Sequence, residues 1–176
     1  MRTLLLESLI KAPLTEKLTG EADRLSALGG LLARGAQRKL GRSLSIREVD
    51  AGSCNGCELE INALSNAYYD LERFGLRFVA SPRHADVLLV TGPVTKNMKE
   101  ALERTYEAMP EPKWVVAAGD CTLDGGCYAG SYAVVGGVSN VVPVDVNIPG
   151  CPPTPVQLLE TLVALLEGVN RAPKVP

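Results

Sequence analysis

Two short apolar runs constrain the fold of this chain more than any other feature. Residues 87–90 and 114–118 carry no charged side chain and are bounded by loop residues on both sides. Such runs are typical of β-strands that helices cover on both faces of a sheet. A helix is predicted between them at residues 96–108, since Thr95 can cap its start and Pro110 follows its end. Strands that alternate with helices indicate an α/β fold with a central parallel sheet.

Further strands are predicted from the same kind of pattern at residues 44–49, 76–80 and 140–144. The first of them alternates apolar and polar side chains, as half-buried strands do. A helix is predicted over residues 57–74, and Gly75 supplies its end. A last helix is predicted after Thr154, because proline and glutamine follow this residue in the order of a capped helix start.

The first 43 residues fit the sheet pattern least, and we predict an N-terminal, partly helical arm. The leucines between residues 21 and 40 have loose helical spacing, which Gly29, Gly30 and Gly35 interrupt. Two alternatives stay open: a solvated or partly disordered arm, or an arm that orders against partner subunits or an anionic membrane surface. The predicted division is therefore an arm at 1–43, a body at 44–170 and a tail at 171–176.

Composition argues against several functions. The chain has 176 residues, a net charge of -2 and 5% aromatic residues, so we expect no nucleic-acid binding. No apolar run approaches the roughly 20 residues that span a bilayer, and we expect a cytoplasmic protein. The glycine pairs at 125–126 and 136–137 lack the Lys-Ser/Thr of a phosphate loop, so nucleotide binding is not expected either.

Four of the five cysteines follow predicted strands. Cys54 and Cys57 form a Cys-x-x-Cys pair after the first strand, whereas Cys121 and Cys151 each follow a later one. Because the carboxyl ends of parallel strands share one edge of a sheet, we expect these four thiols to meet there. An odd number of cysteines without an evident disulfide framework fits metal binding better than disulfides.

A quartet of thiolates suits a soft metal, either a structural zinc ion or an iron–sulfur cluster. Structural zinc sites usually use two tight Cys-x-x-Cys pairs on a small ribbon, and here only one pair is tight. The spacing therefore favours an iron–sulfur cluster, with a zinc scaffold module as an alternative. Main-chain N–H groups could approach the sulfur atoms because four glycines flank the cysteines: Gly52, Gly56, Gly119 and Gly150.

Five segments carry a resemblance to a known family: residues 53–58 (Ser-Cys-Asn-Gly-Cys-Glu), 81–86, 91–95, 119–121 and 143–153, which contains Pro-Gly-Cys-Pro-Pro. Together they resemble the small subunit of membrane-bound, energy-converting NiFe hydrogenases, above all that of formate hydrogenlyase. The resemblance covers roughly residues 44–168. The same superfamily includes the quinone-proximal iron–sulfur subunit of respiratory complex I, which has adjacent cysteines where this chain has Cys-x-x-Cys.

The resemblance implies a flavodoxin-like three-layer sandwich and one 4Fe–4S cluster with Cys54, Cys57, Cys121 and Cys151 as ligands. It also implies an electron relay between ferredoxin-like multi-cluster subunits and the NiFe site of a large subunit. Integral membrane subunits would hold the complex at the cytoplasmic face of the membrane, and this chain would not be catalytic alone. The alternative is the quinone-proximal subunit of a complex I-type oxidoreductase, whose large subunit lacks nickel.

Four more residues are candidates for a proton relay or an interface: Glu58, Asp120, Arg83 and His84. Glu58 starts a predicted helix, where a negative charge stabilises by about 0.3–1 kcal/mol without any further role. Asp120 reads as a loop acid with an interface contact as the alternative. By resemblance, the loop with Arg83 and His84 faces a cleft shared with the large subunit, whereas a lone loop histidine is ordinarily a surface residue.

The fifth cysteine, Cys127, departs from the family, which usually has another residue near this position. We expect it to be a small buried residue in a loop, because a free cysteine packs well as a hydrophobe. The alternatives are a substitute ligand or a redox-sensitive thiol.

Overall fold

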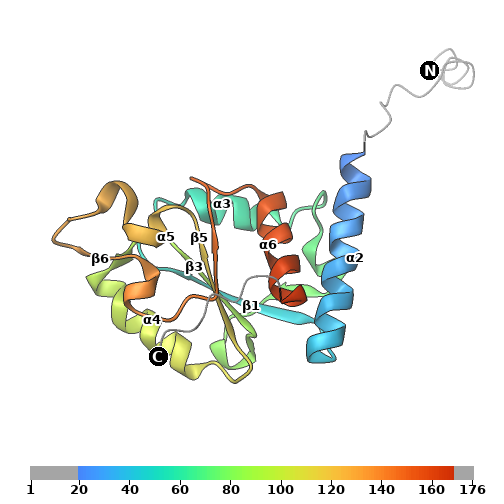
Figure 1. Cartoon of the computed structure of the whole chain (residues 1–176), viewed down its shortest axis with the longest axis horizontal. Helices are drawn as coiled ribbons and strands as arrows, with labels where there is room; N and C mark the ends of the chain where they lie inside the picture. Colours follow the sequence, from blue (N-terminus) through green and yellow to red (C-terminus); the bar gives the residue numbers. More distant parts are fainter. Residues whose placement is uncertain (1–19, 169–176) are drawn as a thin grey trace, which may run out of the picture.

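A parallel sheet forms the centre of the structure, as the apolar runs predict (Figure 1). The structure is a computed structural model that describes residues 20–168. Within this range the main sheet has the order β2–β1–β3–β5–β7, with strands β1 (Leu44–Asp50), β2 (Leu76–Phe78), β3 (Val87–Thr91), β5 (Trp114–Ala118) and β7 (Val146–Ile148). All neighbouring pairs in this sheet are parallel. This is the strand order of flavodoxin-like folds, so the predicted α/β fold class is confirmed.

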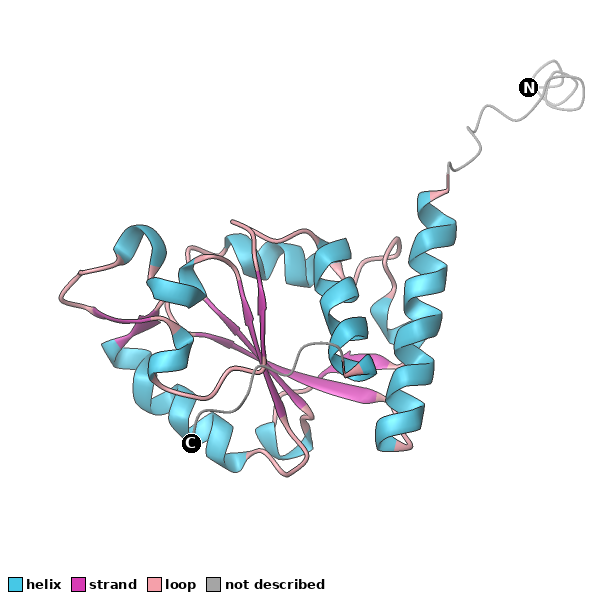
Figure 2. Cartoon of the chain, viewed as in Figure 1, coloured by secondary structure: helices cyan, strands magenta, loops and turns pink. Residues whose placement is uncertain are grey.

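Helices cover both faces of the sheet and make three layers (Figure 2). One face packs against α2 (Glu21–Leu40), α3 (Gly56–Ala63) and α6 (Pro155–Glu167), and the other against α4 (Lys96–Ala108). Val87 and Leu89 point into the first core, whereas Leu88 and Val90 point into the second, because successive strand residues alternate. The bounds of α4 and β5 are the predicted ones.

Short elements complete the described part of the chain. They are the antiparallel pair β4 (Val94–Thr95) and β6 (Val134–Gly136), the helix α5 (Cys121–Asp124), and the 3-10 helices η1 (Leu71–Phe74), η2 (Pro82–His84), η3 (Gly126–Tyr128) and η4 (Val138–Asn140). None of the helices within residues 20–168 combines the length and apolarity that a bilayer-spanning segment needs.

Helix α2 belongs to the core, which rules out the alternative of a solvated or partly disordered arm for residues 21–40. Its inward side chains are buried with α6 and the sheet: Leu25, Leu32 and Ala36. Its glycines are points of close contact, because a Cβ atom at Gly29 would collide with the Phe74 ring and one at Gly35 would lie 3.0 Å from the Leu166 Cβ. Residues 1–19 lie outside the described range, so the contact of an arm with partners or a membrane stays a prediction.

The helix after the Cys-x-x-Cys pair is shorter than predicted. Helix α3 ends at Ala63, and the predicted extension to residue 74 is wrong. The side chain of Asn66 accepts hydrogen bonds from the N–H groups of Tyr68 (2.8 Å) and Tyr69 (3.0 Å). This turn competes with a continuing helix, and Asp70 then adopts a positive φ of 45°.

The last strand of the sheet lies later in the chain than predicted. The structure has β7 after Asp145, and the strand predicted at 140–144 is wrong. Asp145 donates its N–H to the Val115 carbonyl (2.9 Å), and its carboxylate accepts the Val115 N–H (2.9 Å). Pairing with β5 therefore begins at Asp145, whereas Pro143 has no N–H to donate to a ladder.

Candidate metal centre

All five cysteines line one cavity at the carboxyl edge of the sheet. Cys54 and Cys57 follow β1, Cys121 follows β5, Cys151 follows β7, and Cys127 comes from η3. They are free thiols around a cavity of about 120 Å³, whose other lining residues are mostly glycine and proline. The topology thus brings together the four thiols that the sequence proposes as ligands. It also places Cys127 with them and exposes it, which corrects the prediction that this side chain is buried.

The donors around the cavity suit an iron–sulfur cluster. A Cβ atom at Gly119 would lie 2.7 Å from the Cys57 Sγ, and one at Gly126 would lie 2.9 Å from the Cys121 Sγ. Both positions therefore need glycine to leave room beside the sulfur atoms. Within residues 20–168, no three His, Cys, Asp or Glu side chains gather closely enough to enclose a single metal ion. The thiols surround a volume instead, and soft thiolates are the usual ligands of iron–sulfur clusters.

The glycines beside the sulfur atoms are only partly those expected from the sequence. Gly56 and Gly119 do face thiols, since a Cβ atom at Gly56 would lie 3.5 Å from the Cys54 Sγ. Gly52 and Gly150 instead face Thr95 and Pro153. Gly126 also faces a thiol but was not predicted to do so, although the sequence shows a glycine pair directly before Cys127.

Two aspartates hold the loops that carry the cysteines. Asp120 donates its N–H to the Gly150 carbonyl (2.9 Å), and its carboxylate accepts the Gly150 N–H (2.8 Å). This reciprocal pair ties the loop after β5 to the loop after β7. In the loop after β1, the Asp50 carboxylate accepts the N–H groups of Gly52 and Ser53, both at 2.7 Å. Both aspartates thus position ligand loops, a role that the sequence did not reveal.

Burial and neighbouring charges raise the pKa values of two thiols in the cavity. Burial raises the pKa of Cys57 to about 12, and the charges of Glu58 and three other cysteines add to the effect. Burial also raises the pKa of Cys121, with the charges of Cys151, Cys127 and Cys54 adding to it. Because metals bind the thiolate form, a bound metal must displace protons from these groups.

Glu58 is a buried carboxylate next to the ligand pair. It is 8% exposed, and neither of its oxygens has a hydrogen-bond partner in the described part of the chain. It lies in the first turn of α3, where the positive end of the helix dipole favours a negative charge. Its neighbour across the layer is Glu48 of β1, whose pKa is raised by burial first and then by the charges of Glu58 and Asp50.

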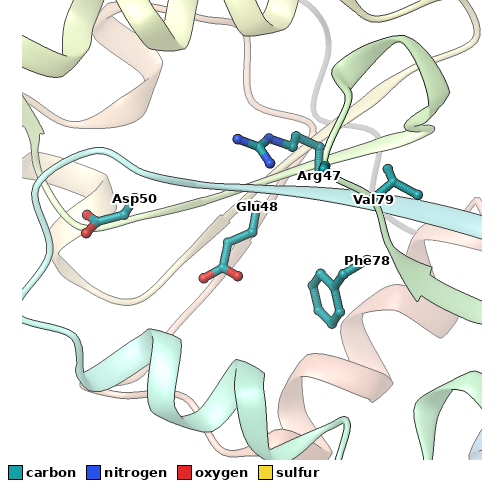
Figure 3. Close-up of a pocket in the computed structure, with 6 residues that line it drawn as sticks. Arg47, Glu48, Asp50, Phe78 and Val79 are labelled. Carbon is teal, nitrogen blue, oxygen red and sulfur yellow. The ribbon is translucent and has the colours of Figure 1, made fainter.

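A second cavity, of about 320 Å³, opens at the edge of β1 beside these acids (Figure 3). Strand β2 pairs only with Leu44 to Ile46, so β1 has an open edge beyond Ile46. Arg47, Glu48 and Asp50 line the cavity together with residues 78–80. In Figure 3, Glu48 extends from one face of β1 and Arg47 from the other.

The sequence of this chain matches a known protein family. Residues 54–165 match the family described as NADH ubiquinone oxidoreductase, 20 kDa subunit. The chain belongs to this family. The matched segment begins at the first thiol of the cavity and contains all five cysteines.

Relatives in this 20 kDa subunit family include a hydrogenase component. An uncharacterized protein of Methanocaldococcus jannaschii is 51% identical over 122 residues, which cover 69% of this chain and 82% of that protein. Formate hydrogenlyase subunit 7 of Escherichia coli is 48% identical over 122 residues, which cover 69% of this chain and 48% of that subunit. The match thus spans about half the length of the hydrogenlyase subunit. The predicted resemblance to the hydrogenase and complex I small subunits is confirmed at the level of the family.

Two solved structures have the same fold. A chain of the membrane-bound sulfane sulfur reductase, an archaeal respiratory membrane complex, is 37% identical with a TM-score of 0.65, covering 78% of this chain and 75% of that chain. A chain of the NAD+-reducing NiFe-hydrogenase is 21% identical with a TM-score of 0.58, covering 77% of this chain and 96% of that chain. The second likeness concerns the fold alone.

The structure separates Arg83 and His84 from the thiol cavity. Both lie exposed on η2, which packs against α4, and neither lines the cavity. Glu58 and Asp120 are the two candidates that lie beside it.

We expect Glu48→Gln to stabilise the protein at neutral pH. Because the folded-state pKa of Glu48 is raised, its favourable contribution exists below the unfolded pKa of roughly 4.3 and is lost as the pH rises through the folded value. A neutral glutamine removes a charge near Glu58, so the melting temperature should rise by roughly 2–4 °C at pH 7, the shift that about 1 kcal/mol gives at this size.

Calorimetry of the full chain between pH 4 and pH 7 measures this effect, which should shrink toward pH 4. Glu72→Gln, at an exposed position of η1, is the matched control and should leave the melting temperature unchanged. An equal response of both variants would contradict the coupling between the carboxylates.

Proposed function

We propose that this chain is an electron-transfer subunit that carries one 4Fe–4S cluster on Cys54, Cys57, Cys121 and Cys151. The observation that carries this proposal is the convergence of these thiols, from three separate strand ends, on one cavity. Membership of the 20 kDa subunit family supports it. When bound, the cluster would supply one-electron transfer, and the chain itself would supply the ligands and a rigid, partly dry wall of glycine and proline.

The exposed edge around the cavity supports docking of a redox partner. Large apolar side chains near the cysteines in sequence are exposed in the described structure: Leu59 in α3 (63%), Leu123 in α5 (51%) and Tyr128 (46%), which lines the cavity itself. We propose that a NiFe hydrogenase-type large subunit covers this edge. The cluster would then lie between the large subunit and ferredoxin-like multi-cluster subunits.

We further propose that the complex includes integral membrane subunits and lies at the cytoplasmic face of the membrane. The similarity to formate hydrogenlyase subunit 7 and to a chain of a respiratory membrane complex supports this placement. The chain is then a subunit of an oxidoreductase and not an enzyme by itself.

The second candidate function is the same electron relay in a complex whose large subunit contains no nickel. The family description and the similarity to a chain of the sulfane sulfur reductase favour it. Nickel content of the purified complex separates the two candidates, because only the hydrogenase holds nickel in its large subunit.

Roles outside the cluster site follow from the position of each side chain. For Glu58 we propose proton transfer at the subunit boundary, which its burial without a hydrogen-bond partner in the described structure supports. For Asp120 we propose an interface contact in addition to its bond with Gly150. For Arg83 and His84, their exposure on η2 supports an interface away from the cluster.

The proposal is tested by low-temperature electron paramagnetic resonance of the dithionite-reduced protein, purified without oxygen, with iron and zinc counted on the same sample. We expect about four irons per chain and the signal of a reduced 4Fe–4S cluster. One zinc ion per chain, without iron and without a signal, would instead make the chain a structural module.

A further inference from the structure

Cys127 reaches the thiol cavity because the chain reverses sharply after Cys121. Helix α5 ends after a single turn, and the next two residues, Gly125 and Gly126, have positive φ values of 99° and 55°. Side chains other than glycine rarely adopt these values. The reversal therefore depends on both glycines, and it returns the chain to the cavity at Cys127.

The reversal places this segment against the side chain of Cys121. Gly125 donates its N–H to the Cys121 carbonyl (3.0 Å). A Cβ atom at Gly126 would lie 2.9 Å from the Cys121 Sγ and 3.2 Å from its Cα. The backbone directly before Cys127 thus lies so close to the Cys121 sulfur that it leaves no room for a side chain at Gly126.

Cys127 lies on the Cys121 side of the cavity. The residue directly before it, Gly126, lies against Cys121, and both cysteines belong to the segment between β5 and β6. Cys57 is instead close to Gly119, and a Cβ atom there would lie 2.7 Å from its sulfur. Cys121 therefore has a fifth thiol as a neighbour on its own loop, whereas Cys57, which is half-buried, lies in a different segment at the start of α3.

We propose that Cys127 is a reserve ligand for the iron atom that Cys121 binds, an inference that rests on the proposed cluster. In the exchange, the iron–sulfur bond to Cys121 breaks and a bond to the Cys127 sulfur forms. The proton of the Cys127 thiol passes to the departing Cys121 thiolate. The number of electrons and the charge of the cluster stay the same, so the exchange needs no oxidant or reductant.

The exchange also fits the difference in exposure between the two thiols. Cys121 is half-buried in the first turn of α5, whereas Cys127 is exposed in η3. A thiol held in an exposed 3-10 turn can move toward the iron without disturbing a strand of the sheet. Loss or modification of Cys121 would then change the ligand and leave the cluster in place.

The test uses the full chain in its complex, purified without oxygen, with iron counted and the reduced cluster observed by electron paramagnetic resonance. The variants are Cys121→Ala, Cys127→Ala and the double variant, and Cys57→Ala is the matched control. We expect Cys127→Ala to keep the iron and the signal of the unchanged protein. Cys121→Ala should keep more than half of the iron with shifted g-values, while the double variant and Cys57→Ala should keep almost none.

Three results would overturn the proposal: Cys121→Ala as empty as Cys57→Ala, equal iron in Cys121→Ala and the double variant, or loss of the cluster in Cys127→Ala. Circular dichroism on each sample checks the fold, and a Cys121→Val series, whose side chain cannot bind iron, repeats the comparison if the alanine variant does not fold. If the protein without any substitution contains no iron, the proposed function itself is wrong. That outcome can be told apart from the three above, because they concern differences between the variants.

Discussion

Gly119→Ala is expected to remove the cluster from an otherwise folded chain. Gly119 has a φ of 99°, and a Cβ atom there would lie 2.7 Å from the Cys57 Sγ. The methyl group would occupy space beside a proposed ligand, and the Gly119 N–H, which bonds to the Ile148 carbonyl (2.9 Å), limits how far the loop can move away. Iron should fall from about four atoms per chain to below one. Iron analysis with electron paramagnetic resonance measures the loss, and circular dichroism checks the sheet.

Gly130→Ala is the matched control for this variant. Gly130 has a φ of 79°, but nothing lies within 4 Å of a Cβ atom placed there. The control therefore has comparable backbone strain, of the order of 1–2 kcal/mol, without the contact to a thiol. We expect it to keep its iron. Equal iron loss in both variants would assign the effect to strain and contradict the role of the contact.

Leu32→Ala is expected to lower the free energy of unfolding by about 2–5 kcal/mol, the usual effect of a cavity at a fully buried leucine. Leu32 is 0% exposed and belongs to the core that α2, α3 and α6 form with the sheet. Urea unfolding of the full chain measures the change.

Leu31→Ala is the control on the same helix, because the substitution is identical and the side chain is 39% exposed. We expect its effect to stay within about 0.5 kcal/mol. Equally small effects of both variants would mean that α2 is the loose arm that the sequence left open, and would contradict the packing described above.

The sequence was sufficient to predict a helix or strand whose bounds depend on residues within or beside that segment. Helix α4 has the predicted bounds, with Thr95 at the N-cap position and Pro110 after its end. The predicted cap itself is wrong, because the Thr95 hydroxyl donates to the Ala51 carbonyl (3.1 Å) and makes no capping hydrogen bond to the helix. The meeting of the thiols was also predictable, because it requires only that each cysteine follow a parallel strand. Neither conclusion needed knowledge of which side chains touch.

Contacts between distant segments account for what the sequence could not predict. Gly29 is compatible with α2 because its open side receives the Phe74 ring, a residue 45 positions later. The start of β7 depends on hydrogen bonds between Asp145 and Val115. The place of Cys127 is an exception, because it depends on a local signal that was missed: the two glycines directly before it turn the chain back toward the cavity.

The three origins of the thiols set an order for maturation of the protein. The four proposed ligands come from the ends of β1, β5 and β7, and the sheet must align these strands before the thiols can surround one cavity. The proposed cluster would therefore be inserted only into a chain that is already folded. Since Cys54 and Cys151 are exposed at this stage, an iron–sulfur carrier has direct access to the site. Any partner that covers the same edge must arrive after the carrier has left.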